Sequence, residues 1–132
     1  MAPVVALLSA AVLAGCGSAP NDLFVLTRSG TVPGASLRML ISDDGSATCN
    51  GRPARITDQE LLDARQLQRD LEQPASSATA LAPGPQPVFT YSVRTPGGTV
   101  GFSDDSAGQP AAFYRFAAFV REVARGRCGL VR

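Results

Sequence analysis

The chain has 132 residues, which is enough for one domain with a single hydrophobic core. It is 45% hydrophobic and 17% charged, and its formal net charge is +1. These values exclude an intrinsically disordered chain, and they lack the basic excess that is typical of nucleic-acid-binding proteins.

A run of apolar and small residues from Val4 to Ala14 comes first. It has the length of the hydrophobic region of a secretory signal peptide and is too short to cross a bilayer as a helix. The alternative is a buried helix of a cytosolic protein, but Pro and Gly bracket the run and no polar face accompanies it. The run therefore predicts export.

The run ends in Leu13-Ala14-Gly15-Cys16, an aliphatic residue and two small residues followed by cysteine. This tetrapeptide resembles the lipobox of bacterial lipoproteins. The resemblance implies that residues 1–15 are a signal peptide, that cleavage falls between Gly15 and Cys16, and that Cys16 carries diacylglycerol and palmitate. Two or three acyl chains make a firm membrane anchor, because each buried methylene contributes about 0.8 kcal/mol. The protein would then lie on the extracytoplasmic face of the cell membrane.

Residues 16–22 are the expected lipidated tether of a single domain over residues 23–132. Alternation of apolar and polar residues predicts strands at 23–29 and 36–42, and a third strand after the turn Asp43-Asp44-Gly45. A three-residue turn with glycine in the left-handed position aligns the apolar residues of the second and third strands on one face. In this register Ile41 lies opposite Ala47, and Met39 lies opposite Cys49.

The best-marked helix begins at the capping box Thr57-Asp58-Gln59-Glu60. Apolar residues follow it at helical spacing, namely Leu61, Ala64, Leu67 and Leu71. We expect Pro74 to end this helix. Residues 74–87 contain few apolar side chains, and we expect them to form a flexible or polyproline-like loop that does not pack.

A second hairpin and a final helix complete the predicted elements. Apolar residues alternate on both sides of the turn Pro96-Gly97-Gly98 in matching register, namely Phe89, Tyr91, Val93, Val100 and Phe102. A helix then follows Pro110, with Gly126 as its predicted C-cap. Its apolar stripe consists of Phe113, Phe116, Ala117, Val120, Val123 and Ala124.

The element order βββαββα predicts an α+β fold, a small antiparallel sheet with both helices packed on one face. Cys49 and Cys128 are the cysteines that remain once Cys16 is lipidated. Outside the cytoplasm such a pair is expected to form a disulfide. The alternative is a pair of buried free thiols.

The residue types that most catalytic and metal sites require are missing. The chain has no histidine, and all twelve basic residues are arginine. A histidine-based triad, an imidazole zinc site and serine–lysine catalysis are therefore excluded. Adjacent carboxylates occur at Asp43-Asp44 and Asp104-Asp105, but turns select such residues and the spacing does not fit an EF-hand loop. We expect no enzymatic activity, no metal and no cofactor.

Several segments share a pattern with a known family. They are Phe24-Val25-Leu26-Thr27-Arg28-Ser29-Gly30, Gly34, Phe89-Thr90-Tyr91-Ser92-Val93 and a closing helix after Pro110. In these segments the chain resembles the emfourin family. Members of this family are small bacterial inhibitors of thermolysin-like metalloproteases. The resemblance spans most of residues 23–125. It implies binding to an extracytoplasmic protein such as a protease.

The candidate binding loop is Arg28-Ser29-Gly30-Thr31-Val32-Pro33-Gly34. A loop with Gly and Pro beside a strand presents rigid backbone and a lone arginine to a partner, while the alternative is an ordinary connecting turn. We expect a monomeric, membrane-anchored envelope lipoprotein that acts as a non-catalytic binding module. The competing interpretation is a structural or accessory envelope lipoprotein.

Overall fold

The computed structural model describes residues 21–132. The expected signal peptide over residues 1–15, the cleavage between Gly15 and Cys16 and the lipidation of Cys16 fall outside the described residues. Within residues 21–132, no helix combines the length and the apolar character needed to cross a membrane.

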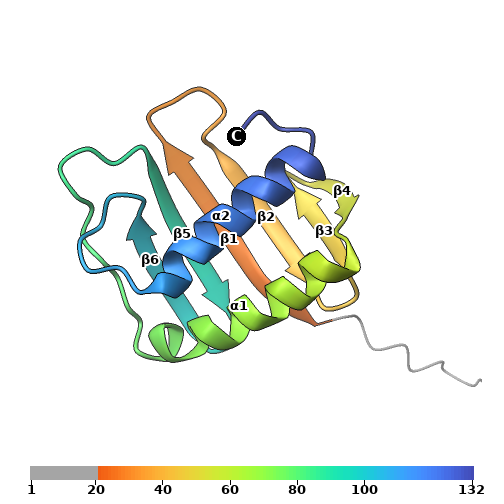
Figure 1. Ribbon diagram of the computed structural model, residues 1–132, viewed down its shortest axis with the longest axis horizontal. Helices are drawn as coiled ribbons and strands as arrows, with labels where there is room; N and C mark the ends of the chain where they lie inside the picture. The colour runs from red at the N-terminus through yellow and green to blue at the C-terminus, as the bar shows by residue number, and fades with distance from the viewer. Residues whose placement is uncertain (1–20) are drawn as a thin grey trace, which may run out of the picture.

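Six antiparallel strands form one sheet in the order β4-β3-β2-β1-β5-β6 (Figure 1). Their bounds are β1 Asp22–Gly30, β2 Leu37–Ser42, β3 Ser46–Cys49, β4 Arg52–Arg55, β5 Phe89–Thr95 and β6 Gly98–Ser103. The expected α+β fold is confirmed. The central strand β1 pairs with β2 on one side and with β5 on the other, so the two hairpins meet across it.

Two helices, α1 over Asp58–Ser76 and α2 over Ala111–Gly126, cover the same face of this sheet (Figure 1). They run antiparallel, because Arg115 near the start of α2 pairs with Asp70 at 2.9 Å and Arg127 just after α2 pairs with Glu60 at 3.0 Å. The capping box at Thr57 is present and satisfies two backbone N–H groups at the start of α1.

The predicted hairpin registers are confirmed. Ile41 lies opposite Ala47 in the first hairpin, and Val93 lies opposite Val100 in the second. Alternate residues of each strand therefore point toward the helices, where the core forms. The core includes the fully buried ring of Phe24, which meets Phe116 of α2 edge to face with the ring centres 5.0 Å apart.

The opposite face of the sheet carries polar side chains. Leu23 to Leu26 of β1 are all buried, but the rest of β1 and the whole of β5 alternate between inward and exposed residues, the exposed ones being Thr27, Ser29, Thr90, Ser92 and Arg94. Because period-two alternation sends neighbours to opposite faces, the sheet is covered by helices on one face and open on the other.

Three details differ from the sequence-based expectations. A fourth strand, β4, precedes α1, and Pro53 makes it a natural edge strand because proline cannot donate to a further strand. Pro74 does not end α1, which runs to Ser76. The N–H that proline lacks costs little stability here because Pro74 lies in the last turn of the helix. In that turn Ala75 is buried, and Ser77 donates to the Gln73 carbonyl. Gly126 is the last residue of α2 and not its cap, a position that Arg127 takes.

The expectation that residues 74–87 do not pack is also wrong. Leu81 donates to the Gly101 carbonyl at 2.8 Å, and Gly101 donates to Thr79 at 2.9 Å, so this segment covers the free edge of β6. The Asp105 carboxylate holds the segment further along by accepting from the N–H groups of Gly84 and Gln86. Covering the edge satisfies backbone groups that otherwise invite pairing with another chain.

The predicted disulfide is confirmed. Cys49 at the end of β3 is bonded to Cys128, just after α2, with the two Cα atoms 6.0 Å apart. Together with the Arg127–Glu60 ion pair, this bond fixes the end of α2 over the β3 side of the sheet. The other side of α2 faces β5 and β6, and there the packing leaves a cleft.

Candidate binding cleft

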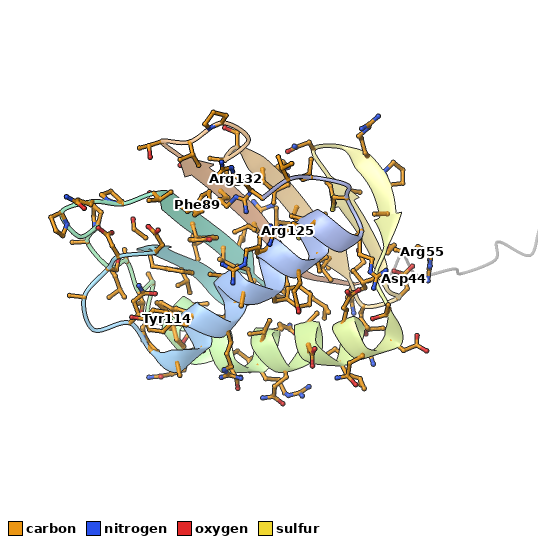
Figure 2. All side chains as sticks on the ribbon, turned by 45° about the horizontal axis from the view of Figure 1, so that its top comes forward. Asp44, Arg55, Phe89, Tyr114, Arg125 and Arg132 are labelled. Carbon is orange, nitrogen blue, oxygen red and sulfur yellow. A yellow bond between two sulfur atoms is a disulfide. The ribbon has the colours of Figure 1, made fainter. Side chains whose placement is uncertain are left out.

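A cleft of about 760 Å³ lies between α2 and the sheet. Its floor comes from β1, β5 and β6, one wall from α2, and its far rim from the β1–β2 loop and the last residues of the chain. Figure 2 shows Tyr114 and Arg125 along α2, with Phe89 and Arg132 on the sheet side. This volume falls in the range of ligand-binding clefts.

The wall of the cleft is one stripe of α2. Tyr114, Ala118, Arg121 and Arg125 are spaced three or four residues apart and line the cleft together with Ala117. The neighbouring stripe, which includes Phe116 and Val120, is buried in the core. The two alanines are short, so the helix leaves space above the sheet at its centre, and the longer side chains extend at both ends.

Aromatic rings form the floor. Tyr91 stacks on Phe102 with the ring centres 4.9 Å apart, and Phe102 stacks on Phe113 of α2 at 4.7 Å. Phe89 lies beside Tyr91 and is only partly buried, so part of this side chain remains open to a ligand. Stacked rings anchored on the core give a floor that moves little when a ligand binds.

Arg28 of β1 is almost completely buried, with 2% of its surface exposed. Its Nε donates to the Ala35 carbonyl at 2.8 Å, and its Nη2 donates to the main-chain oxygens of Arg132 at 3.1 Å and Gly34 at 3.4 Å. The guanidinium carbon also lies 4.9 Å from the centre of the Phe89 ring, which is a cation–π contact. Arg28 therefore ties the loop and the chain's last segment to β1.

The electrostatics of the floor centre on Tyr91. Burial raises the pKa of Tyr91 above its usual range; the charge of Asp104 adds to that rise, and the charges of Arg28 and Arg121 oppose it. Burial also lowers the pKa of Arg28, and the contact with Tyr91 opposes this change. The phenol hydroxyl of Tyr91 is therefore influenced by two guanidinium groups, one at the floor and one on the wall, and by one carboxylate.

The predicted binding loop is divided by the fold. Arg28, Ser29 and Gly30 belong to β1, where Arg28 points inward to the cleft floor and Ser29 lies on the open face. Thr31, Val32, Pro33 and Gly34 form the connection to β2, closed by a hydrogen bond from Ala35 to the Val32 carbonyl. Pro33 lines the cleft.

Arg28 is consequently not the exposed arginine that the sequence suggested. A sequence pattern places arginine at the surface by default, and the carbonyl groups that bind this one come from segments that only the fold brings together. Thr31, Pro33 and Gly34 are exposed and fixed by those bonds, so the loop forms a rigid rim of the cleft.

Gly30 owes its identity to close packing at the end of β1. A Cβ atom at this position would collide with the Val88 carbonyl and would lie 2.8 Å from the Cβ of Ala35. The same strand end donates from Thr31 to the Val88 carbonyl at 3.1 Å. Gly30 therefore lets the start of the β1–β2 loop approach the segment that leads into β5.

The cleft is strongly cationic. Four arginine side chains line it, namely Arg28, Arg121, Arg125 and Arg132, against one side-chain carboxylate, Asp104, so the formal charge of the lining side chains is +3. None of the four is in any of the three ion pairs found within residues 21–132. The Asp104 carboxylate already accepts from the N–H groups of Val88 and Phe89. Most of the positive charge is therefore uncompensated by the domain.

Sequence reasoning missed the arginines on the wall. Arg121 and Arg125 lie outside the apolar stripe that the sequence marks on the last helix, and both are exposed. They are four residues apart and follow the small residues Ala117 and Ala118. This pattern identifies a cleft wall only when the position of the sheet beside the helix is known.

The carboxylate pairs hold turns. Asp44 accepts from both the N–H and the hydroxyl of Ser46, and these bonds lower the pKa of Asp44. Asp43 pairs with Arg65 at 2.6 Å. Over residues 21–132, no three His, Cys, Asp or Glu side chains gather in a way that would hold a metal ion.

No protein-family model, curated protein or solved structure matches the chain.

Proposed function

We propose that this protein is an exported, lipid-anchored envelope lipoprotein that acts as a non-catalytic binding module through the cleft beside α2. The observation that carries the proposal is a concave, preformed site whose lining side chains have a formal charge of +3 and whose floor is aromatic. Such a combination of aromatic and arginine side chains is typical of binding hot spots.

Export and anchoring are supported by two independent features. The first is the lipobox-like tetrapeptide Leu13-Ala14-Gly15-Cys16. The second is the Cys49–Cys128 disulfide, since structural disulfides form mainly outside the reducing cytoplasm.

The position of the cleft suits a tethered binder. The chain enters β1 at Asp22, only six residues after Cys16, and this central strand runs to the opposite end of the sheet (Figure 1). Arg28 lies six residues along this strand, about 20 Å from Asp22 at the usual rise of an extended chain. An anchor at Cys16 would hold the Asp22 end near the membrane, and the cleft would face away from it.

The nature of the partner follows from the rigid rim. Exposed Thr31 and Pro33 beside the cleft offer a fixed backbone to an extracytoplasmic protein, as the likeness to emfourins implies for a protease. We include inhibition of a thermolysin-like metalloprotease in the proposal as its most specific form.

The anchor is tested by metabolic labelling with a palmitate analogue. We expect label on the wild type and none on Cys16→Ser, because the Cys16 thiol is the lipid acceptor. Equal labelling of the two proteins would contradict the anchor assignment.

Inhibition is tested by titrating the full chain, purified in mild detergent, against thermolysin-like proteases and a peptide substrate. We expect inhibition that the double variant Arg121→Glu/Arg125→Glu weakens, while the matched variant Arg38→Glu/Arg94→Glu on the rest of the surface does not. Arg38 and Arg94 are exposed and lie outside the cleft. No inhibition at micromolar concentration would remove the protease-inhibitor form of the proposal and leave the binding module to be tested with other partners.

A further inference from the structure

The cleft has a shape and a charge that define the chemistry of its occupant. Its α2 wall runs from Tyr114 to Arg125, and these two residues lie about 16 Å apart along the axis at the rise of an α-helix. An extended peptide of about five residues has the same length.

The charges are distributed along the wall and the rim. Arg121 lies one turn from Arg125 on α2, and Arg132 lies across the cleft on the sheet side (Figure 2). All three are exposed at the cleft and make no ion pair with residues 21–132. A row of guanidinium groups favours a ligand with several carboxylates, because each pairs bidentately and desolvation strengthens the contact.

The floor adds an apolar requirement. Phe89 is partly exposed beside Tyr91, and Tyr114 on the opposite wall has 57% of its surface exposed. Ala117 and Ala118 keep the space between them open. An aromatic side chain of a ligand would fit against these rings over the alanines.

Main-chain oxygens already gather at this end of the cleft. Arg28 donates to those of Ala35, Gly34 and Arg132, which come from the β1–β2 loop and from the last segment of the chain. A backbone segment lying along this end would meet a surface that already binds main-chain oxygens.

We propose that the cleft binds an extended acidic segment, about five residues long and carrying an aromatic residue, of a partner protein. This inference rests on the proposed binding function and specifies the ligand of the same site. The carboxylates of the segment pair with Arg121, Arg125 and Arg132, and its aromatic side chain packs between Phe89 and Tyr114.

The test is fluorescence anisotropy with labelled nine-residue peptides and the full chain in mild detergent. Three peptides are compared: one with three Glu around a central Phe, one with the Glu replaced by Lys, and one with the Phe replaced by Ala. We expect the acidic aromatic peptide to bind best, the Lys peptide not to bind, and the affinity to fall as salt screens the charges.

Two double variants with the same loss of charge provide the comparison. Arg121→Gln/Arg125→Gln is expected to weaken the acidic peptide about tenfold, because two charge-assisted contacts are lost. Arg38→Gln/Arg94→Gln, outside the cleft, is expected to change the affinity less than about threefold, as screened surface charges contribute little. All four residues are exposed, so both proteins should fold.

Equal weakening by the two double variants would overturn the inference, because it would mean attraction by overall charge alone. Equal binding of the acidic and Lys peptides would also overturn it. Displacement of the peptide by free 2-naphthoate at the same concentration would overturn it too, because the ligand of the cleft would then be a small organic anion. None of these results removes the binding module itself, which fails only if no partner contacts the cleft on cells.

Discussion

Replacing Arg28 by methionine should destabilise the domain by about 2 kcal/mol. Methionine keeps an unbranched apolar stem but donates no hydrogen bonds, so three main-chain oxygens lose their donor. Those of Gly34 and Arg132 belong to exposed residues and can turn to water. The carbonyl of Ala35, a residue with 2% of its surface exposed, cannot, and an unsatisfied buried acceptor costs about 1–3 kcal/mol.

The loss should be visible in both chemical and thermal unfolding. A change of 2 kcal/mol corresponds to a lower Tm by about 8 °C in a domain of roughly 110 residues. Urea titration monitored by tyrosine fluorescence and circular dichroism gives the unfolding free energy, and an unchanged m-value shows that the unfolding reaction is the same.

The matched control is Arg94→Met. Arg94 lies on the neighbouring strand β5, is exposed, and has no ion pair within the described residues, so its loss should change stability by less than about 0.5 kcal/mol. If the Arg28 and Arg94 variants agree within 0.5 kcal/mol, the carbonyl contacts of Arg28 do not hold the fold and our reasoning about the cleft floor is wrong.

Three further predictions concern other parts of the fold. Reduction of the Cys49–Cys128 disulfide, which joins residues 79 apart, should lower the unfolding free energy by about 4 kcal/mol; coinciding urea curves with and without reductant would contradict this. Gly30→Ala should cost more than about 2 kcal/mol because its Cβ meets the neighbouring backbone, whereas Gly126→Ala at the end of α2, where nothing is near, should be neutral or stabilising in the same titration. The partial burial of Glu60 raises its pKa, but hydrogen bonds and the charge of a nearby arginine outweigh burial, so the pKa is lowered. The ionised form of Glu60 therefore stabilises the fold above about pH 4.5. This stabilisation is lost as the pH falls through the lowered pKa. The stability difference between wild type and Glu60→Gln should shrink from pH 7 to pH 3, and a constant difference would mean that the charge of this residue does not matter.

The parts of the fold that local sequence predicts are those with local causes. The turn Asp43-Asp44-Gly45 determines the register of the first hairpin, and the φ of +84° at Gly45 is one that glycine adopts without strain. The capping box at Thr57 likewise determines where α1 begins.

Other features escaped sequence reasoning because their causes are distant in the chain. The strand β4 is short, mostly exposed and contains Pro53, so it lacks the alternation that marks a strand. The burial of Arg28 depends on carbonyl groups supplied by Ala35 and by Arg132, the latter 104 residues away.

The candidate site follows the same division. The sequence predicts Pro33 and Gly34 as part of a binding loop because Gly and Pro mark loops. It does not predict the arginines of the α2 wall, which belong to a site only because the aromatic floor of β5 and β6 lies beside them. A cleft is a property of packing between elements, and no local pattern specifies it.

Site-specific photo-crosslinking on intact cells tests the central claim, that a partner binds in the cleft, most directly. A photoreactive phenylalanine is placed at Tyr114 on the exposed cleft wall, and a control at Thr99, an exposed position on β6 outside the cleft. Our account predicts a discrete protein adduct from position 114 that disappears in the Arg121→Glu/Arg125→Glu background, and no such adduct from position 99. Adducts from position 99 alone, or an adduct from position 114 that survives the charge reversal, would contradict it.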